Sequence, residues 1–540
     1  MSWRTAVGCA LLSALFMVAP VDSQSGAPRL LVIVVVDQMR ADYLSVFQRH
    51  WTHGFRTLLA EGAVFENAEY PYANTATCPS HATVATGAFP HTHGITGNTW
   101  WDRDRAVLVD CSIDESAAGA HISYGRPARS GNGPHLLTAD TIGDELRRRW
   151  AASRVVVLSL KPDSAVTLAG HGGDVVTWFD LGAGSFVTSR AFTAAPKQVV
   201  ADFIADNPLA SDLSATWTLL KTPDSYVNPD ATSGQRPPAG RDGLFPHEIS
   251  GPKGPDARSV GFWQQSPLSD RYLGRMAAAM IERLELGRDD SPDLVAVGFS
   301  APDLVGHAFG PGSREVEDVL AHLDRTLGDL LEELDRRIGR DRYVLALTAD
   351  HGVAPVPQPP NGGRLITEDI QDRIEELLQS RWGPARSGYY AAVRGPYVYF
   401  APGLLERLRA DSAVQHAVLR TISELPGVLR VLSADELSAA SRDPLVRAAA
   451  LSHVPGRSGD LVIVPQPGWL PGGRNVTAAT THGTPHEYDR RVPLILFGGS
   501  VRAGRFAQRA SPADIAPTLA SLVGVSMPGA EGRVLREGLK

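Results

Sequence analysis

The sequence contains few cysteines, three in 540 residues, and one of them, Cys9, lies in an apolar segment at the N-terminus. The other two, Cys78 and Cys111, are too few for a disulfide framework, and the count excludes a structural zinc site built on cysteine. The fold must therefore be held together by its hydrophobic core. Cys78 and Cys111 could form one bridge with each other, but their spacing neither requires nor forbids it.

Long basic runs are also absent, and the formal net charge is -7. Because binding to a nucleic-acid backbone needs a clustered cationic surface, nucleic acid is not expected to be the main partner. Hydrophobic residues make up 43% of the chain and charged residues 21%, which is typical of a globular protein and excludes a disordered or fibrous one. The composition leaves the oligomeric state open.

The chain has only one long apolar run, at residues 6–21, and it is shorter than the roughly 20 residues that span a bilayer. One arginine precedes this run and a small-residue ending, Val21-Asp22-Ser23, follows it. This pattern predicts a secretory signal peptide at residues 1–23, with an uncleaved anchor as the alternative. We therefore expect residues 24–540 to be exported to a periplasmic or extracellular location, without a permanent membrane span.

Short apolar runs rich in β-branched residues recur along the chain, at residues 30–36, 154–159, 293–299, 343–349 and 493–497. Their continuous rather than alternating apolarity indicates strands that are covered on both faces. A helical pattern with apolar side chains every three or four residues spans 316–338 and ends at Gly339, just before the fourth run. Strands that alternate with helices predict an α/β fold with a mostly parallel sheet and helices on both faces.

Three segments fit this alternation poorly and are rich in glycine and proline: residues 99–134, 185–264 and 356–478. We interpret them as insertions that form a cap over one end of the sheet. Residues 24–540 are then one hydrolase domain with three inserted segments.

Acidic residues occur where three of the predicted strands end, and histidines are near them. Asp37 and Asp350 directly follow two of the runs, and Asp303 comes four residues after a third; the associated histidines are His307, His351 and His482. In a parallel sheet, ligands bind beyond the carboxyl ends of the strands. Each aspartate alone could equally be a helix cap. Together, three carboxylates and three imidazoles suit zinc, and two zinc ions about 4 Å apart would favour an in-line displacement at phosphorus.

The stretch "NTATCPSHATVATG" at residues 74–87 places four candidate nucleophiles close together: Thr75, Thr77, Cys78 and Ser80. His81 follows them directly. The pattern alone is also typical of a loop that turns into a helix. It does not by itself identify which hydroxyl or thiol is reactive.

Six separated motifs, taken together, resemble the alkaline phosphatase superfamily. They are "VVVDQMRADYL", "NTATCPSHATVATGAFPHTHGITGN", "SAPDLVGHAFGPGS", "TADHGV", "THGTPHEYDRRVPLILFG" and "ASPADIAPTLASLVGV". The resemblance spans about residues 31–535 and is strongest to the secreted phosphate-irrepressible alkaline phosphatases, relatives of the nucleotide pyrophosphatase/phosphodiesterases. It implies an alkaline-phosphatase-like fold with a mostly parallel central sheet, helices on both faces and inserted cap segments.

The resemblance also implies a role for each candidate residue. Thr77 would be the nucleophile at the start of a helix, whose N-terminus favours a developing negative charge. One zinc ion, shared with Thr77, would be held by Asp37, Asp350 and His351, and the other by Asp303, His307 and His482. Thr75 and Ser80 would be loop and cap residues, and His81 a helix residue rather than a general base. His486 occupies a position that the family does not use for metal.

Asn98 and Lys161 match the family's substrate-binding amide and cation. The sequence departs from the family directly after Lys161, because Lys161-Pro162-Asp163 replaces the usual Lys-x-Arg. A sulfatase is disfavoured because Cys78-Pro79-Ser80 does not fit the C-x-P-x-R pattern. The sequence predicts a di-zinc phosphate-ester hydrolase that acts on small molecules through a phosphothreonine intermediate, with phosphomonoesterase activity favoured. The alternatives are a phosphodiesterase or nucleotide pyrophosphatase and, more remotely, an inactive metal-binding protein.

Overall fold

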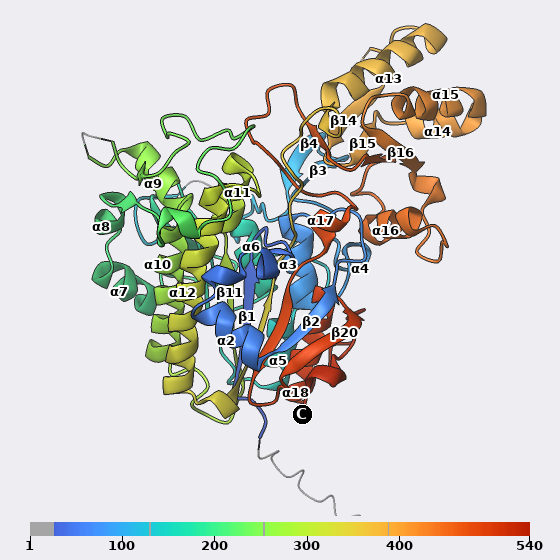
Figure 1. The fold of residues 1–540 in the computed structure, drawn as a ribbon. Helices are drawn as coiled ribbons and strands as arrows, with labels where there is room; N and C mark the ends of the chain where they lie inside the picture. The colour runs from blue at the N-terminus through green and yellow to red at the C-terminus, as the bar shows by residue number, and fades with distance from the viewer. Residues whose placement is uncertain (1–25, 129–130, 252–253, 387) are drawn as a thin grey trace, which may run out of the picture.

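The computed structural model describes residues 26–128, 131–251, 254–386 and 388–540 (Figure 1). The predicted signal peptide at residues 1–23 lies outside these ranges and remains a prediction. Among the described residues, no helix combines the length and apolarity that crossing a membrane requires.

A ten-stranded sheet forms the centre of the molecule. In spatial order its strands are β20 (Gly504–Ala510), β2 (Ala63–Ala68), β19 (Leu494–Gly498), β12 (Tyr343–Thr348), β1 (Leu30–Val36), β11 (Asp293–Phe299), β6 (Val155–Ser159), β7 (Val175–Asp180), β8 (Ser185–Ser189) and β5 (His121–Ser123). The five strands from β12 to β7 are all parallel. The predicted α/β fold with a mostly parallel sheet is confirmed.

Strand β19 corresponds to the predicted run at residues 493–497, but it is antiparallel to both of its neighbours, β12 and β2. The chain reaches β19 from α17 (Glu487–Arg490), just after the segment that carries His482 at the carboxyl end of the parallel strands. A strand that starts at this end must run in the opposite direction. Continuous apolarity indicates that both faces of a strand are covered, but it does not indicate the direction of the strand.

Helices cover both faces of the sheet, and alternate side chains of β1 show the two cores. Val32 and Val34 pack in the core beneath α2 (Gly54–Glu61), α10 (Pro267–Arg283) and α12 (Arg314–Arg337). Leu31 and Ile33 pack in the core beneath α3 (Thr77–Thr86), α5 (Ile142–Arg149), α6 (Pro162–Ala169) and α18 (Ile515–Leu522). Burial on both faces explains why this strand is apolar throughout.

Helix α12 matches the predicted helix at residues 316–338 to within two residues. Its apolar side chains face the core, and the chain leaves the helix at Gly339, whose φ of 92° is one that glycine adopts without strain. Strand β12 begins four residues later. This part of the prediction is confirmed.

Residues 356–478 contain a second, four-stranded sheet in the order β14 (Tyr390–Arg394), β15 (Tyr397–Phe400), β17 (Leu461–Pro465) and β16 (Val428–Ser433). One face packs against α13 (Thr367–Trp382), α14 (Leu404–Ala410) and α15 (Ser412–Ser423). The other face packs against α16 (Pro444–Ser452), β3 (Thr99–Asp102), and Cys78 and Ala82 of α3. The unit lies beyond the carboxyl ends of the parallel strands, at the upper right of Figure 1.

Residues 185–264 begin with β8, an outer strand of the central sheet, and also contain α7 (Gln198–Asp206), α8 (Ala210–Leu213), β9 (Thr216–Trp217), β10 (His247–Glu248) and α9 (Ala257–Gln264). Buried carboxylates of α12 anchor this segment. Asp318 accepts a hydrogen bond of 2.7 Å from Trp217 Nε1, and Glu317 accepts from the backbone N–H groups of Val227 and Asn228 at 2.8 and 2.9 Å.

The remaining α-helices and strands are α1 (Tyr43–Val46), α4 (Pro90–His93), β4 (Val107–Asp110), α11 (Ala301–Phe309), β13 (Gly363–Ile366) and β18 (Trp469–Gly472).

Candidate active site

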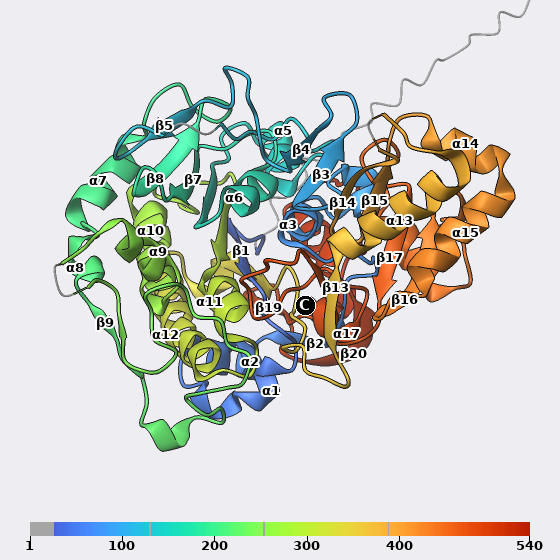
Figure 2. The same ribbon diagram turned by 90° about the horizontal axis from the view of Figure 1, so that it is seen from above.

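The candidate ligands gather at the carboxyl ends of β1, β11 and β12. Asp37 directly follows β1, Asp350 comes two residues after β12, and Asp303 lies in the first turn of α11, which follows β11. Seen from this end of the sheet, α3, α6 and α11 surround the end of β1 (Figure 2). The topology therefore brings together three aspartates that are separated by up to 313 positions, as expected for a parallel sheet.

Asp37, Asp350 and His351 form the first ligand group. One ligand atom from each lies within 4.8 Å of the others. The Nε2 atom of His351 is 3.6 Å from Asp37 Oδ1, 3.2 Å from Asp350 Oδ2 and 3.3 Å from the hydroxyl oxygen of Thr77. Both carboxylate oxygens of Asp37 and Oδ2 of Asp350 are buried and accept no well-aligned hydrogen bond from the described residues. Buried oxygens of this kind are suited to a cation.

Asp303, His307 and His482 form the second ligand group. Asp303 Oδ1 is 3.2 Å from His307 Nε2 and 3.8 Å from His482 Nε2. His351 of the first group also lies close, because its ring stacks on that of His482 with centroids 3.5 Å apart, and its ligand atom is within 4.8 Å of those of Asp303 and His482. We nevertheless assign His307 to this group, since its Nε2 atom is directed at Asp303. The two groups form one continuous cluster.

All three histidines present the same ring nitrogen to the carboxylates. The Nδ1 atoms of His351, His307 and His482 lie 2.9, 2.9 and 3.2 Å from the backbone carbonyl oxygens of Gly352, Thr480 and Thr75. Because a carbonyl oxygen can only accept a hydrogen bond, Nδ1 carries the proton in each ring. The Nε2 atoms therefore face the cluster, which is the arrangement of metal-binding histidines.

The electrostatics of the cluster also favour a bound cation. Burial, together with the charges of Asp303 and Asp350, raises the pKa of Asp37 well above its usual range. Burial raises the pKa of Asp350 to about 7. Placing several carboxylates in one buried space is costly unless positive charge compensates them. The residues thus fit a metal site both in their donor atoms and in their charge.

Lys161 supplies one positive charge from the N-terminal cap of α6. Its Nζ atom lies 2.6 Å from Asp37 Oδ2 and 2.5 Å from Asp303 Oδ2, so it bridges a carboxylate of each ligand group. The sequence predicts that Lys161 contacts the substrate. The structure places its ammonium group within this cluster, next to α3, the helix that begins at Thr77.

Asn98 is fixed beside Thr77. The backbone N–H of Cys78 donates a 2.9 Å hydrogen bond to Asn98 Oδ1, which leaves the amide nitrogen of Asn98 available as a donor. The backbone N–H of Cys111 donates to the carbonyl oxygen of Asn98 at 2.9 Å, and a disulfide joins Cys78 to Cys111 with 6.5 Å between their Cα atoms. The sequence neither required nor excluded this disulfide, and it is present in the structure.

The other candidates in the 74–87 stretch have structural contacts. Helix α3 begins at Thr77, and no side chain caps it. Ser80 was predicted to be a cap or loop residue, which is wrong: it lies inside α3, and its hydroxyl is 3.0 Å from that of Tyr72. Thr75 donates to the carbonyl oxygen of Thr484 at 3.3 Å. His81 is a helix residue as predicted, with Nδ1 2.9 Å from the carbonyl oxygen of Thr77.

His486 lies outside the cluster. Its Nε2 atom is 2.9 Å from the carbonyl oxygen of Pro465, so the nitrogen that would bind metal already donates a hydrogen bond. Its backbone forms the N-terminal cap of α17.

Gln38 is a residue of this site that the sequence analysis missed. Its Nε2 atom donates to Asp303 Oδ1 at 2.5 Å, and its backbone N–H donates to Asp350 Oδ1 at 3.1 Å. Its φ of 66° is unusual for a residue other than glycine and indicates a conformation that the surroundings enforce. A Cβ atom at Gly306 would lie 1.9 Å from Gln38 Oε1, so a larger residue there would displace the Gln38 amide from its present position. The sequence signal that could have identified Gln38 is its amide side chain directly after the candidate ligand Asp37.

Asp270 is a second missed residue. Its carboxylate on α10 accepts hydrogen bonds of 3.1 and 3.3 Å from the backbone N–H groups of Ser300 and Ala301. It therefore caps α11, the helix that carries Asp303 and His307, from a different part of the chain. A distant cap of this kind has no local sequence signal.

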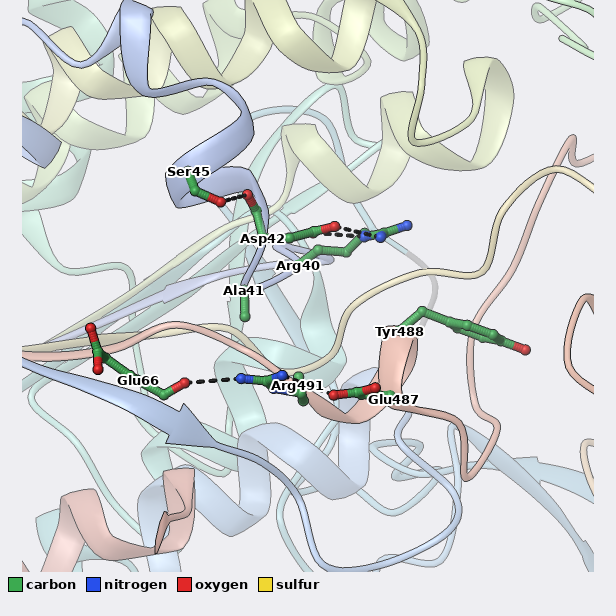
Figure 3. A pocket seen from close by; sticks show the side chains of 8 residues that line it. All are labelled: Arg40, Ala41, Asp42, Ser45, Glu66, Glu487, Tyr488 and Arg491. Atoms are coloured by element: carbon green, nitrogen blue, oxygen red, sulfur yellow. Dashed lines mark hydrogen bonds and ion pairs between the residues drawn. The ribbon is translucent and has the colours of Figure 1, made fainter. Parts of the chain in front are cut away.

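A cavity of about 550 Å³ lies elsewhere, between α1 and α17 (Figure 3). None of the residues that line it is a candidate ligand or the candidate nucleophile. Each of its arginines is paired with a carboxylate of the same cavity, Arg40 with Asp42 at 2.6 Å and Arg491 with Glu487 at 2.8 Å. We therefore take the ligand cluster, and not this cavity, as the candidate active site.

Comparison with known proteins agrees with this fold. The model of the type I phosphodiesterase / nucleotide pyrophosphatase family matches residues 31–489. The chain is 31% identical to alkaline phosphatase PafA of Elizabethkingia meningoseptica over 529 residues, which cover 94% of each chain. It is 30% identical to alkaline phosphatase PhoV of Synechococcus elongatus over 527 residues, covering 95% of this chain and 93% of that protein. A crystal structure of PafA superimposes with a TM-score of 0.87 and covers 95% of this chain and 99% of that one.

The fold, the ligand cluster and these relatives define a metal-dependent phosphoric ester hydrolase of the alkaline phosphatase type. The chain belongs to the type I phosphodiesterase / nucleotide pyrophosphatase family.

Proposed function

We propose that this enzyme is a di-zinc phosphomonoesterase of small-molecule phosphate esters that acts through a phosphothreonine intermediate on Thr77. The observation that carries the proposal is the position of the Thr77 hydroxyl, 3.3 Å from His351 Nε2 and at the first residue of α3. Asp37, Asp350 and His351 would hold one ion next to Thr77, and Asp303, His307 and His482 would hold the other. When bound, the two ions would lower the pKa of the Thr77 hydroxyl and stabilise the leaving oxygen.

The remaining roles follow from the contacts of each residue. Thr77 attacks phosphorus from the first residue of α3, where the positive end of the helix dipole favours the negative charge that develops. Asn98 donates from its amide nitrogen to a phosphoryl oxygen, because its Oδ1 atom is held by the N–H of Cys78. Lys161 contributes a positive charge beside the same oxygens. His81 takes no proton, since burial lowers its pKa to about 3 and Nδ1 is bound to the backbone.

The preference between monoesters and diesters depends on charge. A monoester brings two negative charges and a diester brings one. Asp163 occupies the position of an arginine in the family pattern. The electrostatic attraction between such an arginine and the substrate, which this chain lacks, could reach about 4 kcal/mol at about 4 Å with an effective dielectric near 20. Asp163 accepts a 2.9 Å hydrogen bond from the N–H of Ser164, and its other oxygen is 3.7 Å from Cys78 Sγ, beside the residue that follows Thr77. We expect a weakened monoesterase with appreciable diesterase activity.

Phosphodiesterase or nucleotide pyrophosphatase activity is the second candidate, and the same acidic residue favours it. An inactive metal-binding protein is disfavoured because all six ligands and Thr77 are retained. A side-by-side kinetic comparison of an aryl phosphate and an aryl phosphodiester with the zinc-loaded enzyme tests the proposal. A higher kcat/KM for the diester would replace it by the second candidate, and no turnover of either substrate would replace it by the inactive protein.

We also expect the enzyme to be exported. The predicted signal peptide supports this, and so does the Cys78–Cys111 disulfide, because such bonds persist in oxidising compartments. N-terminal sequencing of the protein recovered outside the cytoplasm would test it, with a first residue near 24 expected.

A further inference from the structure

A buried carboxylate, Asp489 on α17, comes shortly after the candidate ligand His482 in the chain. Its Oδ2 atom accepts two hydrogen bonds from Thr484, one of 2.8 Å from the backbone N–H and one of 2.6 Å from the hydroxyl. Its Oδ1 atom is buried and has no hydrogen-bond partner among the described residues. Because Thr484 is buried as well, removing the carboxylate would leave both of its donors without a partner. Asp489 therefore holds Thr484 at two points.

Thr484 is in turn bound to the loop that precedes Thr77. The hydroxyl of Thr75 donates to the carbonyl oxygen of Thr484 at 3.3 Å, and His482 Nδ1 lies 3.2 Å from the carbonyl oxygen of Thr75. The partner of the His482 ring is thus a backbone carbonyl, and the side chain of that same residue ties it to Thr484. The contacts run from Asp489 through Thr484 and Thr75 to the ring of His482.

The backbone of Asp489 supports a histidine of the other ligand group. Its carbonyl oxygen accepts a 2.8 Å hydrogen bond from the N–H of Gly352, and the carbonyl oxygen of Gly352 lies 2.9 Å from His351 Nδ1. The rings of His351 and His482 stack with an angle of 13° between their planes. Asp489 is therefore connected to the ring of one histidine from each ligand group.

We propose that Asp489 is a positioning residue that sets where His482 lies relative to His351. The contact toward His351 uses the backbone of Asp489 and does not need its carboxylate. The contacts toward His482 pass through the carboxylate and include Thr75, two residues before Thr77. Loss of the carboxylate should therefore displace His482 and the Thr77 loop while His351 stays in place. The proposal rests on the proposed function, in which His482 binds the second ion.

Zinc affinity, measured by chelator competition on the full chain, tests the proposal without relying on turnover. Thr484→Val removes the hydroxyl donor and keeps the shape of the side chain, and Asp489→Ala removes the acceptor. We expect each variant to bind the weaker of its two zinc ions about tenfold less tightly or worse, and the other ion to be affected less, because groups that orient a metal-binding histidine have effects of this size. Asp489→Asn should recover most of the affinity, since its amide oxygen can still accept both bonds.

Asp293 provides the matched control for a general loss of stability. It is also a buried carboxylate with two backbone donors, the N–H groups of Arg154 at 2.7 Å and Gly287 at 2.8 Å. It is the first residue of β11, whereas the ligand cluster lies beyond the last residue of that strand. Asp293→Ala should lower the melting temperature and leave the zinc affinity unchanged.

Two further measurements separate positioning from a merely structural role. Because Asp489 acts through Thr484, Thr484→Val/Asp489→Ala should bind zinc no more weakly than the weaker-binding single variant. With saturating zinc and an aryl phosphate, Thr484→Val should lower kcat more than it raises KM, because the contacts end at His482 and do not include the substrate-binding candidate Asn98. Thr484→Val also keeps the test valid if Asp489→Ala fails to fold.

The outcomes that overturn this proposal differ from those that overturn the proposed function. An unchanged zinc affinity in Thr484→Val, or a loss of affinity in Asp293→Ala as large as that in Thr484→Val, would show that Asp489 does not position His482. In either case, an unmodified enzyme that binds two zinc ions and cleaves the aryl phosphate leaves the proposed function standing. An unmodified enzyme that binds no zinc and cleaves no phosphate ester overturns the proposed function itself.

Discussion

The backbone N–H of Cys78 and the side-chain oxygen of Asn98 are joined by a 2.9 Å hydrogen bond directly after the nucleophile candidate Thr77. This bond orients the amide of Asn98 so that its nitrogen is left for a substrate oxygen. The disulfide to Cys111, whose own N–H is bound to the backbone of Asn98, holds the same loop from its other side. The amide that we propose to bind substrate is therefore positioned by the residue next to the candidate nucleophile.

The first prediction concerns this disulfide. Cys78→Ser/Cys111→Ser removes a link that closes a loop of 33 residues, so the free energy of unfolding should fall by about 3–4 kcal/mol. Because the Asn98 loop is then less constrained, KM should rise more than kcat falls. Denaturant unfolding and steady-state kinetics measure the two effects. An unchanged KM in a stably folded double variant would show that the disulfide does not position Asn98.

Thr77→Ala should lower kcat by about a thousandfold or more while the zinc content stays near that of the unmodified enzyme. Thr77→Ser should keep substantial activity because it retains the hydroxyl. Ser80→Ala is the matched control, since the Ser80 hydroxyl contacts Tyr72 and not the ligand cluster. A dead Ser80→Ala enzyme beside an active Thr77→Ala enzyme would move the nucleophile to Ser80.

Metal removal should abolish activity. Dialysis against a chelator leaves three carboxylates in one buried cluster with Lys161 as their nearest cation, so the melting temperature should also fall. Adding zinc should restore turnover at a stoichiometry near two ions per chain, measured by elemental analysis. Full activity in protein that contains no metal contradicts the assignment.

His482 and His486 provide a pair of neighbouring histidines with opposite expectations. His482→Gln removes a ligand of the second group and should lower both zinc content and kcat/KM by at least about tenfold. His486→Gln should leave the zinc content at two, because the His486 ring is bound to the carbonyl oxygen of Pro465. If the zinc content falls only in His486→Gln, the ligand assignment must be exchanged.

Lys161 and Asp163 should control the choice between ester classes. Lys161→Ala removes a positive charge beside the substrate and should lower kcat/KM for an aryl phosphate more than for an aryl phosphodiester. Asp163→Arg should raise kcat/KM for the aryl phosphate by at least about tenfold, because it replaces a repulsion of the dianion by an attraction. Equal effects of Lys161→Ala on both esters would show that this lysine does not discriminate between monoesters and diesters by their charge.

The sequence predicts Asp37, Asp303, Asp350 and His351 because each lies within four residues of the end of an apolar strand, where a parallel sheet binds its ligands. His307 and His482 lie farther from a strand end, and the resemblance to the family implies their roles. The sequence does not predict Gln38 or Asp270. The amide of Gln38 reaches Asp303 across 265 positions of the chain, and Asp270 caps a helix that begins 31 residues later. The antiparallel direction of β19 was missed for a related reason: direction is set by where the preceding segment ends in space, and no residue within the strand encodes it.

Gln38 touches a carboxylate of each ligand group, Asp303 through its side chain and Asp350 through its backbone. A shift of Asp303 therefore changes the surroundings of Asp350, and the reverse also holds. Organising one group should lower the free energy still needed to organise the other, so we expect the two groups to behave as a single thermodynamic unit. The affinity of either group for an ion would then be a property of the pair, in the way that two linked binding sites share one coupling free energy.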